Sequence, residues 1–192
     1  MLIAAIDPGI KNFAFSIENV DVDTVRGIRD LSTLVLCSET VFFANIELCD
    51  TTTRELTRVL NLYTHLWEQV DVVLVERQMQ FRSIINTKAL RVAHHCLSYF
   101  ELSFHEMVVV DFPSSNKTRV LGAPSGMTKP QRKKWSVAYA SEILEERGDC
   151  ETIKMRETMG RKLDDVSDCL LMCMAYTSLK YRCKKKVTKA TR

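Results

Sequence analysis

Runs of apolar residues that stop at an acid mark the strands of this chain. The sequence opens MLIAAIDPGI, in which an apolar run ends at Asp7, and DVVLVE at residues 71–76 ends at Glu76 in the same way. An uninterrupted apolar run is typical of a strand buried on both faces, so both segments are predicted as central strands. Three more extended runs, at residues 12–17, 34–43 and 107–112, are predicted as strands, and the first pairs with the opening strand across a turn at Pro8 and Gly9.

Apolar residues recur at helical spacing in later segments. The clearest follows TTTRE, where Thr52 as N-cap and Glu55 three residues on predict a capping box that opens a helix over residues 53–69. Further helices are expected over residues 86–100, 130–147 and 163–180, with a basic linker after the strand at 107–112. Three strands followed by alternating helices and strands predict an α/β fold with a mixed five-stranded sheet flanked by helices.

The composition narrows the class of protein. The chain has 192 residues and is 46% hydrophobic, which suits one domain with its own core, placed at residues 1–180. No apolar run reaches the length of about 18 residues that a membrane span needs, and no targeting peptide is visible, so we expect a soluble intracellular protein. Seven cysteines without a CxxC pair indicate reduced core thiols.

Charge is distributed unevenly along the chain. The net charge is +3, yet the C-terminal stretch KYRCKKKVTKATR holds seven of the 27 Lys and Arg residues and none of the 24 acids. Residues 181–192 are therefore treated as a separate basic tail. Such a tail is either a solvated end or a segment that binds a polyanion through counterion release, and both readings stay open here.

Four acids form the candidate catalytic set: Asp7, Glu76, Asp165 and Asp168. If the first two strands that end in acids are parallel neighbours, their backbones lie roughly 5 Å apart, and burying both charges without compensation is costly. Asp165 and Asp168 lie three apart at a helix start and share a face, although helix capping is the plain alternative and Asp164 leaves the register open. Divalent cations are the natural compensation. Hard oxygen ligands suit two Mg²⁺ ions about 4 Å apart, with Mn²⁺ as a substitute, for phosphodiester displacement.

Three motifs, in this order and at this spacing, resemble a known family. IDPGIKNFAFS, LVERQMQFRS and DDVSD are similar to the RuvC-like Holliday junction resolvases of the RNase H-like superfamily, particularly those of poxviruses and iridoviruses. The resemblance spans residues 2–178 and implies an RNase H-like fold. It also implies a Mg²⁺-dependent endonuclease that resolves four-way DNA junctions by paired symmetric nicks as a homodimer. Without a visible import leader, we favour the viral over the fungal mitochondrial branch, and hence the host cytoplasm or nucleus.

The resemblance further implies roles for individual residues. Asp7, Glu76, Asp165 and Asp168 match the metal-binding acids, and Lys117 in FPSSNKTRVLG falls at a position resembling the family's catalytic lysine, with a solvated loop as the alternative. Other basic, polar and aromatic residues near these motifs are candidate DNA contacts, namely Lys11, Asn12, Arg77, Gln78, Phe81, Arg82, Arg119, Lys129, Arg132, Lys133 and Lys134.

Other functions share part of this pattern. Actin-like sugar kinases also begin with an Asp-x-Gly hairpin, but that fold needs a second such domain and a Gly-rich loop, and this chain has 192 residues and six glycines. An RNase H-like nuclease with other substrates and a non-catalytic nucleic-acid-binding module of the same fold remain alternatives. The apolar stripe on the helix near residues 86–104 either forms the dimer contact or packs in the core, and it comprises Ala89, Leu90, Ala93, Leu97 and Phe100.

Overall fold

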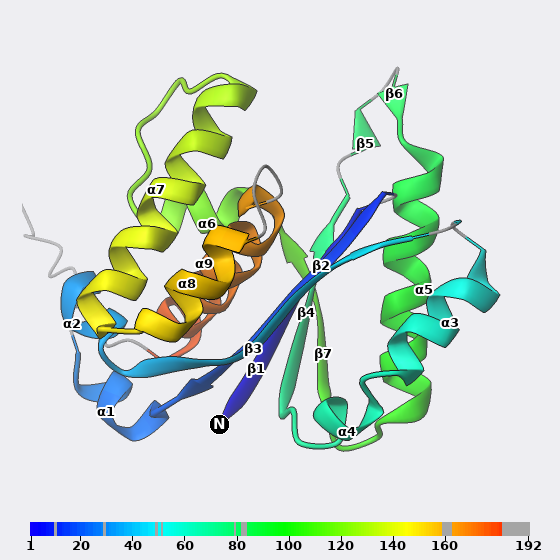
Figure 1. Ribbon diagram of the computed structural model, residues 1–192, viewed down its shortest axis with the longest axis horizontal. Helices are drawn as coiled ribbons and strands as arrows, with labels where there is room; N and C mark the ends of the chain where they lie inside the picture. The colour runs from blue at the N-terminus through cyan, green and yellow to red at the C-terminus, as the bar shows by residue number, and fades with distance from the viewer. Residues whose placement is uncertain are drawn as a thin grey trace, which may run out of the picture.

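A central sheet separates two groups of helices in the computed structural model of the chain (Figure 1). The structure describes residues 1–9, 11–28, 30–48, 50, 52–78, 80–81, 84–158 and 163–181. The five-stranded sheet has the order β3-β2-β1-β4-β7, in which β1, β2 and β3 are antiparallel and β1, β4 and β7 are parallel. Its strands are β1 (Leu2–Pro8), β2 (Asn12–Val20), β3 (Ser38–Glu47), β4 (Val72–Arg77) and β7 (Val108–Pro113). The predicted mixed sheet is confirmed.

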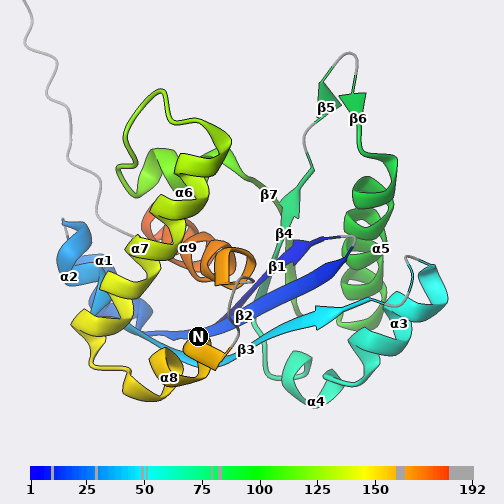
Figure 2. The ribbon, with the colours of Figure 1, turned by 45° about the horizontal axis from the view of Figure 1, so that its top comes forward.

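Each face of the sheet packs against its own helices, as the turned view makes clear (Figure 2). On one face α9 (Leu163–Lys180) lies against β1 and β2, with α7 (Lys129–Arg147), α8 (Cys150–Thr158), α6 (Ser115–Val120), α1 (Val22–Gly27) and α2 (Leu31–Val35) around it. The other face carries α3 (Thr53–Asn61), α4 (Thr64–Trp67) and α5 (Thr87–Ser103). A short hairpin of β5 (Gln80–Phe81) and β6 (Ile84–Ile85) precedes α5. Within the described residues, no helix is long and apolar enough to span a membrane.

The central strands are buried on both faces, as their unbroken apolar runs predict. Side chains alternate along β1, so Ile3 and Ala5 belong to the core beneath α9 while Ala4 and Ile6 belong to the core beneath α5. In β4 the even-numbered apolar residues face α9 and the odd-numbered ones face α5. This alternation decides to which side of the sheet each residue at the end of a strand points.

Two of the predicted elements differ from the structure. Residues 34–37 are not extended: α2 ends at Val35, and β3 begins at Ser38. The cause is a local N-cap, because Asp30 accepts a hydrogen bond from the Thr33 N–H at 2.8 Å and so begins a helical turn. The predicted helix over 53–69 is interrupted by a turn at residues 62–63 that separates α3 from α4.

The start of α3 is partly as predicted. Thr52 caps the helix, since its hydroxyl accepts from the Glu55 N–H at 3.3 Å. The reciprocal half of the capping box is wrong, because the Thr52 N–H donates to Asp50 at 2.8 Å and the Glu55 carboxylate binds Arg58 through two hydrogen bonds of 2.8 Å. The predicted basic linker after residue 112 also contains a helix, α6.

A buried ion pair fastens α7 to the sheet. Arg147 donates to the Glu18 carboxylate at 2.7 Å and to the Val35 carbonyl at 2.9 Å, and the Glu18 side chain is 0% exposed. Burial raises the pKa of Glu18, and the neighbouring guanidinium opposes that rise. This pair anchors the C-terminal end of α7, whose first turns carry the lysines and arginine that face the functional site.

Candidate active site

Asp7 and Glu76 lie side by side at the ends of adjacent parallel strands. Ile6 of β1 pairs with Val75 of β4, so the next residue on each strand is Asp7 and Glu76 respectively. By the alternation described above, both side chains project toward α9. Burial and then the Glu76 carboxylate raise the pKa of Asp7 well above its ordinary value.

The turn after β1 requires a glycine. A Cβ on Gly9 would lie only 2.1 Å from the Asn12 carbonyl oxygen, so no other residue fits without a backbone shift. This tight turn places Asn12 at the start of β2, where its amide donates to Asp165 Oδ2 at 3.3 Å. A hydrogen bond therefore links the first strand pair to α9.

Acids in the first two turns of α9 face the same region. The helix is held to the sheet through Cys169 Sγ, which lies 3.5 Å from the Ala14 carbonyl, so its first turns end beside β1. Asp165 and Asp168 both raise the pKa of Asp7 electrostatically, so acids that are distant in the sequence lie near one another here. Burial, and then the neighbouring Asp164, raise the pKa of Asp165 itself.

Lys117 lies at the centre of this group of acids. Its Nζ is 2.6 Å from Asp168 Oδ2 and 3.0 Å from Glu76 Oε1, and the residue is only 7% exposed. Burial alone would lower the pKa of this lysine, but the two carboxylates outweigh burial and the pKa is raised. The solvated-loop alternative for Lys117 is thereby wrong, since α6 directs the side chain into the site.

The carboxylate oxygens of these acids are suitable ligands for a hard divalent cation. Asp168 Oδ1 is buried without a hydrogen-bond partner in the described structure, and carboxylate oxygens are the ligands that Mg²⁺ and Mn²⁺ prefer. Within the described residues, however, no three His, Cys, Asp or Glu side chains form a ready-made metal-binding group. In this arrangement the Lys117 ammonium supplies the positive charge between Glu76 and Asp168.

A cavity of about 420 Å³ opens over this group and has a cationic wall. Glu76, Lys117 and Asp168 line it, and α7 contributes Lys129, Arg132 and Lys133. Lys133 also forms an ion pair with Asp164. Side chains of this charge attract a phosphate backbone, and the acids beneath them would repel it unless cations were present.

The other predicted DNA contacts are distributed more widely. Lys11, Arg119 and Lys134 are exposed and do not line this cavity. Arg77 and Gln78 line it, although Arg77 Nε also binds Asp111 Oδ2 at 2.7 Å. The side chain of Phe81 and all of Arg82 lie outside the described residues, as do residues 182–192 of the predicted tail.

Sequence reasoning missed serines that line this cavity and one acid that lies outside it. Ser114, Ser115 and Ser136 line the cavity but carry no distinctive sequence signal. Asp111 does carry one, because it interrupts the apolar run MVVVDF just as Asp7 and Glu76 end theirs. Its position along β7 directs its side chain to the other face of the sheet from Asp7 and Glu76, where it pairs with Arg77.

The predicted dimer stripe on α5 divides between two environments. Three of its residues, Ala89, Ala93 and Phe100, are buried within the single chain, whereas Leu90 and Leu97 are only partly buried. Core packing therefore accounts for most of the stripe.

Comparison with known proteins agrees with this geometry. The uncharacterized protein 97L of Invertebrate iridescent virus 3 is 30% identical over 214 residues, covering 93% of this chain and 100% of the viral protein. The fowlpox virus resolvase, in a crystal structure with substrate Holliday junction DNA, superimposes with a TM-score of 0.62 at 22% identity, covering 93% of this chain and 98% of the resolvase. Thermus thermophilus RuvC gives a TM-score of 0.58 at 15% identity, covering 94% and 98% of the two chains.

These likenesses confirm the predicted RNase H-like fold and the predicted resemblance to RuvC-like resolvases of large DNA viruses. The model of the family described as "Poxvirus A22 protein" matches residues 1–180, nearly the whole chain. On sequence and fold together, this chain belongs to the poxvirus A22 protein family.

Proposed function

We propose that this protein is a metal-dependent endonuclease that resolves four-way DNA junctions. The observation that carries the proposal is the meeting of Asp7, Glu76, Asp168 and Lys117 in one site beneath the cationic wall of α7. The fowlpox virus resolvase, which shares this fold, is described with a Holliday junction as its substrate, and this supports branched DNA as the substrate here.

The acids are the residues that would hold the metal. Asp7, Glu76, Asp165 and Asp168 offer only hard oxygen ligands, which favours Mg²⁺, with Mn²⁺ as a substitute and two ions per site. When bound, these ions supply the Lewis acidity that activates a water and stabilises the leaving oxygen of a phosphodiester.

The basic residues of the chain would position the DNA strand. Lys129 and Arg132 on α7 line the cavity, where they would bind phosphates of the strand and hold the reacting one over the acids. Lys117 donates its ammonium hydrogens toward the negative charge that develops on that phosphate. The buried position of Lys117 keeps water away from the charge that it stabilises.

Resolution of a junction requires two cuts placed symmetrically across the crossover. A homodimer with two-fold symmetry supplies two such sites from one gene product, and we propose this assembly for the protein. Each subunit would nick one strand, and the nicks leave 5′-phosphate and 3′-hydroxyl ends that a ligase can seal.

The experiment that tests the function compares substrates and metals directly. End-labelled four-way junction, linear duplex and RNA–DNA hybrid are incubated with the protein in Mg²⁺ and in EDTA. We expect paired nicks in the junction alone, only with Mg²⁺, and products that are ligatable. Glu76→Gln should abolish cutting, while the matched surface variant Glu101→Gln at the far end of α5 should cut normally.

Two outcomes would contradict the proposal. Cleavage of the hybrid or of linear duplex at a comparable rate would indicate an RNase H-like nuclease with other substrates. Tight junction binding without any cutting in Mg²⁺ or Mn²⁺ would indicate a binding module that keeps the fold without the chemistry.

A further inference from the structure

Two acids that are neighbours in the chain have partners of different charge at the start of α9. Asp165 Oδ2 accepts a hydrogen bond of 3.3 Å from the side-chain amide of Asn12, the first residue of β2. Asp164 forms an ion pair with Lys133 of α7 instead. Because an amide is neutral and an ammonium is cationic, Asn12 leaves the charge of Asp165 uncompensated, whereas Lys133 compensates that of Asp164.

Helix geometry explains how the two acids come to be separated. With 3.6 residues per turn, consecutive side chains of a helix project about 100° apart. Since α9 packs against both α7 and β2, Asp164 reaches a partner on α7 while Asp165 reaches one on β2. Asp168, one turn further on, projects between these two directions, and its Oδ2 lies 2.6 Å from Lys117 Nζ.

The hydrogen bond from Asn12 keeps Asp165 close to the first strand. Asn12 follows the tight turn after β1, and the Asp165 carboxylate is near enough to Asp7 to raise the pKa of Asp7. Burial and the neighbouring Asp164 raise the pKa of Asp165, and the Asn12 amide acts against that rise because it stabilises the ionised carboxylate. Asn12 therefore favours the charged form that binds a cation.

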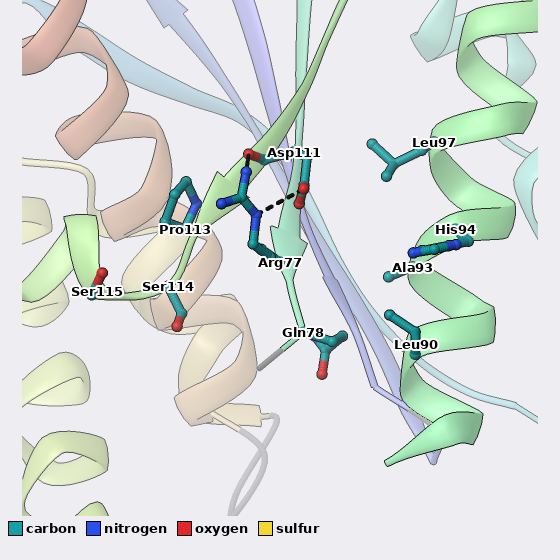
Figure 3. A pocket seen from close by; sticks show the side chains of 10 residues that line it. All are labelled: Arg77, Gln78, Leu90, Ala93, His94, Leu97, Asp111, Pro113, Ser114 and Ser115. Atoms are coloured by element: carbon teal, nitrogen blue, oxygen red, sulfur yellow. Dashed lines mark hydrogen bonds and ion pairs between the residues drawn. The ribbon is translucent and has the colours of Figure 1, made fainter. Parts of the chain in front are cut away.

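A cation also compensates an acid on the other face of the sheet. Arg77 Nε lies 2.7 Å from Asp111 Oδ2 at the ends of β4 and β7 (Figure 3). Asp111 and Asp164 are thus acids near the site whose charge is already paired. Within the described residues, Asp7 and Asp165 form no ion pair, so a divalent cation would meet uncompensated charge at these two.

From these contacts we propose that Asn12 and Lys133 are positioning residues that decide which of the two adjacent acids binds the metal. Asn12 holds Asp165 toward Asp7, and Lys133 holds Asp164 toward α7. The inference rests on the proposed function, since it requires a metal at the acids. It gives Asn12, which the sequence predicted as a DNA contact, a role in the metal site instead.

Mn²⁺ binding in the absence of DNA tests the assignment of the two acids. Electron paramagnetic resonance distinguishes free from bound Mn²⁺ without any catalysis. Asp165→Asn should weaken Mn²⁺ binding by at least about tenfold. Asp164→Asn is combined with Lys133→Met, so that no unpaired ammonium can turn to Asp165, and this protein should bind Mn²⁺ like the unaltered one.

Asn12→Ala tests the positioning role, and we expect it to weaken Mn²⁺ binding by about tenfold. Asn19→Ala is the matched control, since Asn19 lies at the other end of β2 and its amide donates to the Glu39 carboxylate at 3.0 Å. In a protein that already carries Asp165→Asn, Asn12→Ala should have no further effect, because Asn12 acts through Asp165. In cleavage assays Asn12→Ala should lower kcat and leave the KM for the junction unchanged.

Two outcomes would overturn the inference. One is normal Mn²⁺ binding by Asn12→Ala, and a raised KM for the junction would then show that Asn12 contacts DNA. The other is an equal loss of Mn²⁺ binding in the Asp164 and Asp165 variants. If Asn12→Ala fails to fold, Asn12→Leu, which keeps the volume but donates no hydrogen bond, takes its place. Absence of Mn²⁺ binding by the unaltered protein would instead refute the proposed metal dependence itself.

Discussion

Lys117 Nζ lies 2.6 Å from Asp168 Oδ2, and the same ammonium reaches Glu76 at 3.0 Å. Both carboxylates are proposed metal ligands, so the lysine and a divalent cation attract the same two groups. Lys117→Met should therefore bind Mn²⁺ more tightly than the unaltered protein, by about tenfold or more, since a charge at this range shifts an ionic equilibrium by about that factor. Isothermal titration calorimetry measures the affinity, and an unchanged value would contradict the competition.

The same variant should separate stability from catalysis. Without metal, Lys117→Met leaves Glu76 and Asp168 without their cation, and we expect a loss of about 3 kcal/mol in the free energy of unfolding. Added Mn²⁺ should restore most of it by binding the folded state. Cleavage should still fall by about a hundredfold to a thousandfold, because the ammonium donor is gone. Lys154→Met, on an exposed position of α8, serves as the control for both measurements.

Asp7 should make the metal-free protein less stable as the pH rises. Burial and Glu76 raise the pKa of Asp7 in the folded state, so between its ordinary pKa of 3.8 and the raised one the folded state holds a proton that the unfolded state has released. Stability from this group is thus present at low pH and is lost as the pH increases. Asp7→Asn removes the charge and should be more stable than the unaltered protein at pH 8 in EDTA.

Thermal unfolding in EDTA across pH 4 to 8 checks the prediction for Asp7. The exposed Asp23→Asn variant on α1 should follow the unaltered protein throughout. Asp7→Asn should also lose at least about two orders of magnitude in cleavage while it still binds junctions. A destabilised Asp7→Asn protein would mean that the carboxylate has a structural role instead.

The buried pair between Glu18 and Arg147 should contribute strongly to the stability of the fold. Arg147→Met leaves the 0% exposed Glu18 carboxylate without its cation, which should cost about 3–5 kcal/mol in urea denaturation. Glu18→Gln combined with Arg147→Met should recover part of that loss, since no unpaired charge then remains. The surface variant Arg26→Met should change stability by less than about 1 kcal/mol. Additive losses in the double variant would show that the two side chains do not act as a pair.

The basic tail should contribute to DNA affinity through its charge. A protein ending at Tyr181 keeps the described C-terminal packing, in which Tyr181 lies against Tyr176, and lacks six Lys and Arg residues of the tail. Junction binding should weaken, and the slope of log affinity against log salt should become shallower by up to about 5. Fluorescence anisotropy between low and moderate salt measures both, and an unchanged slope would exclude the tail from the DNA contacts.

The acids at the ends of two apolar runs predicted which strand ends lie side by side. The runs before Asp7 and Glu76 had to be buried strands, and parallel pairing then brought their ends together. Asp111 carries the same sequence signal yet faces the other side of the sheet. Side chains alternate between the two faces along a strand, so the position in the strand, and not the apolar run before it, determines the direction.

The remaining features depend on contacts that a linear pattern does not contain. Lys117 lies among polar residues in the sequence, and its burial follows only once α6, β4 and α9 meet. The expected strand over residues 34–43 begins only at Ser38, because a cap at Asp30 starts the short helix α2, which ends at Val35. The pairing of Glu18 with Arg147 joins positions 129 residues apart, beyond the reach of any local motif.

Glu76 and Arg77 are neighbours in the chain, yet their side chains leave β4 on opposite sides of the sheet, so Glu76 meets Lys117 while Arg77 meets Asp111. Deletion of one residue of β4 upstream of Glu76 would exchange the sides of the sheet to which these two side chains point. The Arg77 guanidinium would then point to the side of the sheet where the proposed metal ligands lie, and the Glu76 carboxylate would point toward Asp111. An insertion of one residue would have the same effect. A shift of register within this short strand would therefore disturb both ion pairs at once, whereas a point substitution alters one side chain in its place.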